Sequence, residues 1–219
     1  MRRLQARQSE RMLPVQQFYK PLVKAILVNA IHYEWSVQGF GMFRLYLKDG
    51  TFGRQSVRLH LWDSRWRVPN VTLLHTHPWS LHSHVVAGTI ANHLYRKLDR
   101  LATVSATSDL IDGVYREIPL QAGYGGGLLG EGTAVILVRP EIVTYQEGQS
   151  YHQEPGDIHS SHPYDGTVTL CIREVPQGWN PDHAFVYRRE QEPWVSAEPR
   201  RAARDEIQAA AKYALQQWF

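Results

Sequence analysis

Cysteine is almost missing from this chain, which has only Cys171 among its 219 residues. A single thiol cannot form a disulfide within the chain, so the stability of the fold must come from core packing. A run of about 18 apolar residues is also missing, since the longest candidate, residues 22–31, is interrupted by Lys24 and Asn29. We therefore expect no membrane span. Polar residues follow the basic N-terminus where a signal peptide would have its apolar core, so we expect a cytoplasmic protein.

Basic residues are distributed unevenly, although the formal net charge is only +3. Residues 1–24 carry six Lys and Arg and one Glu, whereas residues 25–187 carry twelve basic and fifteen acidic side chains. A nucleic-acid-binding domain usually places its basic stripe on the folded platform, so we expect no nucleic-acid partner. We interpret the basic arm as a solvated leading helix, and weak binding of an acidic partner is the alternative.

Two signals that define other fold classes are absent. Six glycines lie between residues 123 and 132, but no Gly-Lys-Ser/Thr follows them, which argues against a phosphate-binding nucleotide loop. No convincing amphipathic helix separates the strand-like segments, which argues against parallel βαβ units. Their short length and turn-rich spacing predict a mainly β fold, an antiparallel barrel or sandwich. The expected strands are 42–47, 57–62, 71–76, 82–87, 89–95, 114–120, 134–138, 149–153, 167–173 and 184–188.

Both ends of the chain predict helices. Apolar residues at 22, 23, 26, 27 and 30 recur on one helical face, and Pro21 is expected to break this region. Ser196 and Pro199 indicate a second helix that extends to about residue 217. We therefore divide the chain into an N-terminal helical arm (1–38), a barrel (39–190) and a C-terminal helix (191–219).

Histidine is concentrated in two clusters that are distant in sequence. His75 and His77 are two residues apart, and on a strand such side chains share a face, so both imidazoles can reach one ion. The second cluster, residues 148–159, reads Gly-Gln-Ser-Tyr-His-Gln-Glu-Pro-Gly-Asp-Ile-His and ends at His159. Imidazole suits zinc, copper, nickel and iron, so the residues select no single metal. The alternative is that these are strand histidines hydrogen-bonded to their neighbours.

Together the two clusters resemble the motifs of the cupin superfamily. The first motif runs Gly, five residues, His-x-His, three or four residues, Glu, six residues, Gly; the second runs Gly, five residues, Pro-x-Gly, two residues, His. Here Gly88 follows His75-x-His77 at the expected distance, and Gly148, Gly156 and His159 are in register. The resemblance implies a single cupin barrel (a double-stranded β-helix, or jelly roll) that binds one divalent metal ion through His75, His77 and His159.

The chain departs from the cupin motifs at several positions. Asn70 replaces the first Gly, Glu154 replaces the expected Pro, and Leu81 stands near the position of the Glu ligand. The spacing permits His82 to serve as a fourth ligand instead, and His84 would share its face. The carboxylate is also lost in three-histidine cupins such as the thiol dioxygenases, so its loss does not argue against a metal.

The resemblance to three-histidine cupins implies a function. We expect a mononuclear non-haem iron dioxygenase that acts on a small-molecule substrate, with Fe(II) as cofactor. Trp79 is a candidate substrate-binding residue, and Arg58 and Arg173 are candidates to bind a substrate carboxylate in a bidentate contact. The alternative is a cupin that binds Zn(II) or Ni(II) in a binding, structural or isomerase role, with Tyr151 and His152 as acid and base. Exposed strand edges suit a homodimer.

Overall fold

The structure is a computed structural model that describes residues 16–49, 55–98, 110–120, 130–176, 184–189, 193, 195 and 198–219. Its elements are α1 (Gln16–Val28), a 3-10 helix η1 (Ala30–His32), β1 (Ser36–Gln38), β2 (Phe40–Asp49), β3 (Gln55–Arg67), β4 (Ser80–Ala87), β5 (Thr89–Lys97), β6 (Ile111–Pro119), β7 (Thr133–Gln146), β8 (Ser150–Gln153), β9 (Ile158–Pro163), β10 (Val168–Glu174), β11 (Phe185–Arg189), β12 (Arg200–Arg201) and α2 (Arg204–Trp218).

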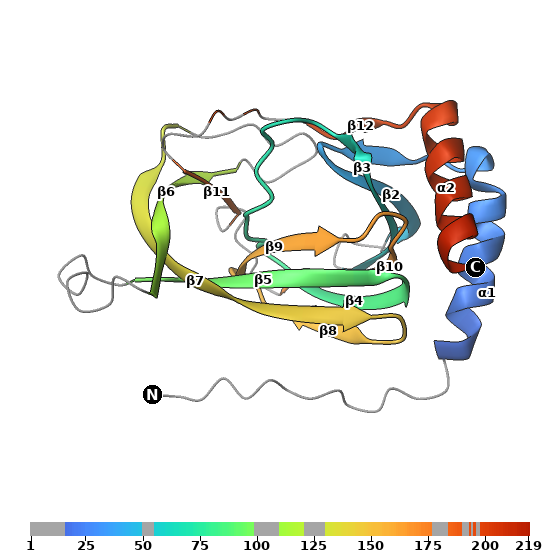
Figure 1. Cartoon of the computed structure of the whole chain (residues 1–219), viewed down its shortest axis with the longest axis horizontal. Helices are drawn as coiled ribbons and strands as arrows, with labels where there is room; N and C mark the ends of the chain where they lie inside the picture. The colour runs from blue at the N-terminus through green and yellow to red at the C-terminus, as the bar shows by residue number, and fades with distance from the viewer. Residues whose placement is uncertain are drawn as a thin grey trace.

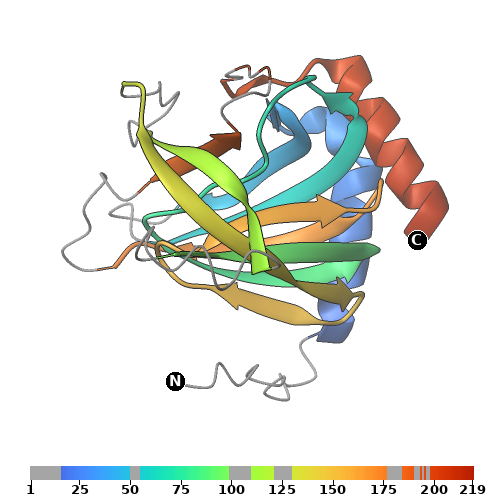
Figure 2. The ribbon, with the colours of Figure 1, turned by 60° about the vertical axis from the view of Figure 1, so that its left-hand side comes forward.

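The strands form two antiparallel sheets. The first sheet has the order β12-β1-β2-β3-β10-β4-β8, and the second has the order β11-β6-β7-β5-β9. The chain first passes from the first sheet to the second between β4 and β5. After β7 it alternates between the sheets, since β8, β10 and β12 belong to the first and β9 and β11 to the second. Figures 1 and 2 show that the strands curl around a common interior. The described fold is therefore mainly β, as the sequence predicts.

The two α-helices lie side by side against one side of the strands (Figure 1). Neither helix is long and apolar enough to cross a membrane. Their apolar faces pack on the outer face of the first sheet in one continuous cluster. This burial removes apolar surface from water at both ends of the chain and joins those ends to the sheet. The cluster includes Val23, Ile26 and Leu27 of α1, Ile207, Ala210, Ala211 and Ala214 of α2, and Leu59, Leu61 and Val168 of the sheet.

Strand β3 is buried on both faces, and this determines which side chains reach the interior. Leu59 and Leu61 belong to the cluster under the helices. Side chains alternate across a strand, so Arg58, His60 and Trp62 lie on the opposite, inner face, and all three are buried. The helices thus cover the outer face and leave a polar and aromatic inner face on the same strand.

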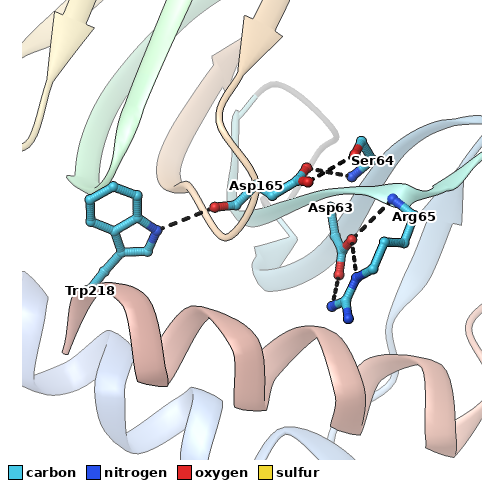
Figure 3. Close-up of polar contacts among 5 residues, drawn as sticks. All are labelled: Asp63, Ser64, Arg65, Asp165 and Trp218. Atoms are coloured by element: carbon cyan, nitrogen blue, oxygen red, sulfur yellow. Dashed lines mark hydrogen bonds and ion pairs between the residues drawn. The ribbon is translucent and has the colours of Figure 1, made fainter.

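The turn between β9 and β10 is attached to both β3 and α2 through Asp165 (Figure 3). Its carboxylate accepts hydrogen bonds from the backbone amide of Ser64 at 2.7 Å and from the Ser64 hydroxyl at 2.9 Å. The indole of Trp218 donates to the Asp165 carbonyl at 3.4 Å. Beside them, Arg65 Nε donates to Asp63 Oδ1 at 2.8 Å. These contacts position the end of β3 and the C-terminus of α2 relative to the turn.

Most of the predicted strands are confirmed, with three corrections. Residues 71–76 form no strand and make only an isolated bridge at His75. Pro21 does not break the first helix but lies inside α1. Strand β9 is not predicted, because its sequence Ile-His-Ser-Ser-His-Pro has few residues that favour strands, and pairing with β5 forms it. Residues 121–129 of the glycine-rich loop and the N-terminal arm before residue 16 lie outside the described residues.

Gly88, which joins the two sheets, lies at a position with no room for an added side chain. Its φ is +87°, and a Cβ there would lie 2.5 Å from Thr167 Oγ1 and 2.9 Å from Thr167 Cα. Thr167 cannot easily move, because its hydroxyl donates to the Thr89 carbonyl at 2.9 Å. We predict that Gly88→Ala lowers the free energy of unfolding by about 3 kcal/mol, from left-handed strain and overpacking together.

Gly148→Ala is the matched control for this prediction. Gly148 has a φ of +84° but no atom within 4 Å of an added Cβ, so only the backbone strain of about 1 kcal/mol should remain. Urea unfolding of both variants measures the difference. Equal losses of stability would contradict the described contact between Gly88 and Thr167.

Candidate metal centre

Backbone hydrogen bonds hold His75 and His159 together. The amide of each residue donates to the carbonyl of the other, both at 3.0 Å, which forms an isolated antiparallel bridge. His75 also bridges to Val186 of β11, and the Gly156 amide donates to the His77 carbonyl at 2.8 Å. The segment before β4 therefore lies between strands from much later in the chain. Residues directly opposite in such a bridge have their side chains on the same face, so the two imidazoles meet.

The rings of His75, His77 and His159 converge. Their ring centroids are 4.6 Å apart for His75–His77, 4.6 Å for His75–His159 and 4.9 Å for His77–His159. One ligand nitrogen from each residue lies within 4.8 Å of the other two. His159 is buried, whereas His75 and His77 are partly exposed. Among the described residues, this is the cluster of His, Cys, Asp or Glu whose ligand atoms suit a metal ion.

Backbone carbonyls determine which nitrogen faces the centre. His75 Nδ1 lies 2.8 Å from the Leu73 carbonyl, and His159 Nδ1 lies 3.0 Å from the Asp157 carbonyl. A carbonyl only accepts, so each Nδ1 carries the proton and each Nε2 keeps its lone pair, the usual arrangement of metal-binding histidines. His75 Nε2 lies 3.0 Å from His77 Nε2. This contact requires either a proton on His77 Nε2 or a cation bound to both nitrogens.

Burial keeps the three imidazoles neutral. Desolvation lowers the pKa of His75, lowers that of His159 to about 3, and lowers that of His77 well below its usual value. Electrostatic interactions with His75 and His159, followed by those with Arg58 and His60, lower the pKa of His77 further. Neutral imidazole is the form that binds a metal. The centre is therefore ready to bind a divalent ion at neutral pH without releasing protons from its ligands.

The residues predicted to contact substrate lie near the centre or on the inner face. Trp79 stacks on His77 with ring centroids 5.6 Å apart, and the Arg173 guanidinium lies 4.8 Å from the Trp79 ring centroid. Arg58 is buried on the inner face of β3. Tyr151 of β8 lies opposite Ser83 of β4 and faces the interior, where its hydroxyl is near Ser83 and Asn92.

The structure does not bring His82 or His152 to the three histidines. They lie opposite each other on β4 and β8, with ring centroids 4.1 Å apart, and both are exposed. His152 Nε2 pairs with Glu154 Oε1 at 3.0 Å. His84 shares their face, where its ring lies 5.7 Å from that of Tyr19 on α1. The outer face of β4 thus carries His82 and His84, which corrects the fourth-ligand hypothesis.

His60 is an inner-face residue that the sequence analysis does not single out. It is 9% exposed, its Nε2 has no hydrogen-bond partner, and its ring packs edge-on against Trp62 at 6.1 Å. Burial, followed by the charges of Arg58 and Arg44, lowers its pKa well below the usual value. The signal in the sequence is its spacing of two from Arg58, which places both residues on one face of a strand.

A mainly β fold with a curled sheet and three converging histidines is compatible with a cupin-like barrel. No protein-family model matches the chain. The search of curated proteins also finds no match. The proposed metal centre is therefore supported by the geometry of His75, His77 and His159 and by the two histidine motifs of the sequence.

We predict that His159→Ala abolishes metal binding as completely as His75→Ala, because each variant removes one of three converging nitrogens. Elemental analysis of protein purified without chelator should fall from about one ion per chain to near zero in both variants. His82→Ala is the matched control and should keep the metal, because this ring lies on the outer face. Retention of full occupancy in His159→Ala would refute the centre.

The lowered histidine pKa values predict that acid destabilises the metal-free protein. The unfolded chain protonates histidine below about pH 6.5, whereas folded His159 resists protonation until its pKa of about 3. Unfolding thus takes up protons between these values, and the free energy of unfolding falls by about 1.4 kcal/mol per pH unit for each such histidine. Urea unfolding of His159→Asn from pH 7 to pH 4 should show a shallower slope than the wild type. Identical slopes would mean that His159 is not buried in this way.

Proposed function

We propose that the chain is a single cupin barrel and a metal-dependent oxygenase that binds Fe(II) through His75, His77 and His159. The observation that carries the proposal is the convergence of three neutral imidazoles in a cluster that contains no described carboxylate. Neutral ligands leave the full charge of a divalent ion in place, and three protein ligands leave coordination positions open. When bound, Fe(II) would supply redox chemistry toward O2 and a small substrate at those positions.

The protein's own residues prepare this centre in three ways. The carbonyls of Leu73 and Asp157 hold the Nδ1 protons of His75 and His159, which keeps each Nε2 available as a ligand. Trp79 stacks on His77 and restricts rotation of that ring. His75 and His77 are partly exposed, so two of the three ligands are accessible to solvent.

The position of His82 favours a catalytic centre over a structural one. A structural zinc site normally has four protein ligands, whereas a catalytic site keeps one position open. With His82 on the outer face, the described residues provide three histidines. This supports an open site, although the imidazole ligands themselves suit Zn(II) and Ni(II) as well.

The second candidate is a non-redox enzyme such as an isomerase, with Zn(II) or Ni(II) in place of iron. The observation in its favour is Tyr151, which lies on the inner face with its hydroxyl buried near Ser83 and Asn92. Burial raises the pKa of this hydroxyl, so it stays protonated at neutral pH and can donate a hydrogen bond to a bound substrate. His152, on the outer face, would not act with it.

Oxygen consumption tests the first candidate against the second. We expect Fe(II)-reconstituted protein to consume O2 when supplied with pools of small organic acids, and to consume little without them. The metal-free protein and His159→Ala should be inactive, and His82→Ala should match the wild type. Zinc or nickel as the only metal in the purified protein, or equal O2 uptake by His159→Ala, would reject the oxygenase.

A further inference from the structure

The inner face of the first sheet carries several basic side chains. Cross-strand pairing places Arg58 opposite Cys171 and His60 opposite Thr169, and Arg173 lies two residues beyond Cys171 on the same face. Asp49 pairs with Ser56 at the end of this face, and its side chain lies outside the described residues. The side chains that the structure describes on this face are uncharged or basic, and they are Met42, Arg44, Tyr46, Ser56, Arg58, His60, Trp62, Leu81, Ser83, Val85, Tyr151, Gln153, Thr169, Cys171 and Arg173.

Arg58 is the clearest case of a buried charge without an anionic partner. It is only 6% exposed, its Nε donates to Ser56 Oγ at 3.1 Å, and its guanidinium lies 4.9 Å from the Tyr46 ring centroid. No described carboxylate forms an ion pair with it. Buried charges in proteins are normally paired, because an unpaired charge loses its hydration without compensation. A buried arginine without an ion pair among the described residues is suited to bind the anionic group of a ligand.

Arg173 strengthens the positive field and connects it to the metal centre. Burial raises the pKa of the Cys171 thiol to about 12, while the charges of Arg58 and Arg173 both act in the opposite direction. Both guanidiniums are therefore close to the same thiol. Arg173 also lies over Trp79, and Trp79 stacks on His77. An anion between the two arginines would thus lie beside the three histidines.

His60 adds a contact for an uncharged polar group. It is two residues from Arg58 on the same face, and its buried Nε2 has no hydrogen-bond partner. Buried polar atoms are nearly always hydrogen-bonded, so an unpartnered one in a binding region indicates a ligand atom. A neutral imidazole nitrogen can donate or accept, depending on its tautomer. A hydroxyl group complements either tautomer.

We propose that Arg58, Arg173 and His60 form a binding subsite for a small hydroxylated carboxylic acid. The two guanidiniums bind the carboxylate, and His60 Nε2 hydrogen-bonds with the hydroxyl. The proposal deepens the proposed function, since the acid would be the substrate of the metal centre. Its binding by these three side chains does not itself require a metal.

Calorimetric titration of metal-free, full-length protein with glycolate, acetate and glycolamide tests the subsite. Glycolamide removes the charge of glycolate, and acetate removes the hydroxyl. We expect saturable glycolate binding that is about tenfold tighter than that of glycolamide, because charged hydrogen bonds are the stronger ones. Acetate should bind several-fold more weakly than glycolate, because it cannot use His60.

Variants assign these differences to individual residues. Arg58→Gln should weaken glycolate binding about tenfold or more, and Arg58→Lys, which keeps the buried charge, should lie between it and the wild type. His60→Leu should bind glycolate and acetate equally. Arg201→Gln is the matched control, because Arg201 is exposed on β12 and pairs with Glu34, and it should bind like the wild type.

Two results would overturn the subsite: no saturable glycolate binding by the wild type, or equal binding by Arg58→Gln, Arg58→Lys and Arg201→Gln. Elemental analysis of the same proteins separates this outcome from failure of the proposed function. Metal retention with no glycolate binding rejects the subsite alone. Glycolate binding that depends on Arg58, in a protein that does not bind metal through His75, rejects the metal-dependent function alone.

Discussion

The reciprocal hydrogen bonds between the backbones of His75 and His159 are the constraint on which the site depends. They attach a segment without regular secondary structure to β9, and they place two imidazoles on one face. Without this bridge, the residues before β4 would have no strand partner at β9 to fix the ring of His75. The carbonyls of Leu73 and Asp157, each two residues before its histidine, then orient the two rings. Backbone geometry thus determines both the position and the tautomer of these ligands.

The helices affect the inner face of the first sheet although they pack on its outer face. By burying Leu59, Leu61 and Val168, α1 and α2 cover the apolar side chains on the outer face of β3 and β10. The inner face of the same strands carries polar residues, including Arg58 and His60, that would be costly in an all-apolar core. The apolar packing of these two strands is therefore concentrated on the helix-covered side.

The sequence predicts the three converging histidines better than their surroundings. His75, His77 and His159 belong to spaced motifs, and the structure brings the three together. The facing of His82 could not be predicted, because residues 83–87 are buried on both faces of β4 and show no alternation. The same burial on both faces hides His60 within β3. Strand β9 forms because it pairs with β5, and Pro21 is tolerated because its helix packs against the sheet. Both features depend on tertiary structure, which local residue propensities do not describe.

Anomalous diffraction from crystals grown without chelator tests whether the three histidines bind a metal, because it locates the ion without reference to activity. We predict one strong peak within bonding distance of the Nε2 atoms of His75, His77 and His159, at about 2.0–2.2 Å. An absorption edge scan on the same crystal would identify the element. A peak at His82 and His152, with none at His75, His77 and His159, would contradict metal binding at the three histidines. Three imidazoles hydrogen-bonded to one another with no metal between them would contradict it as well.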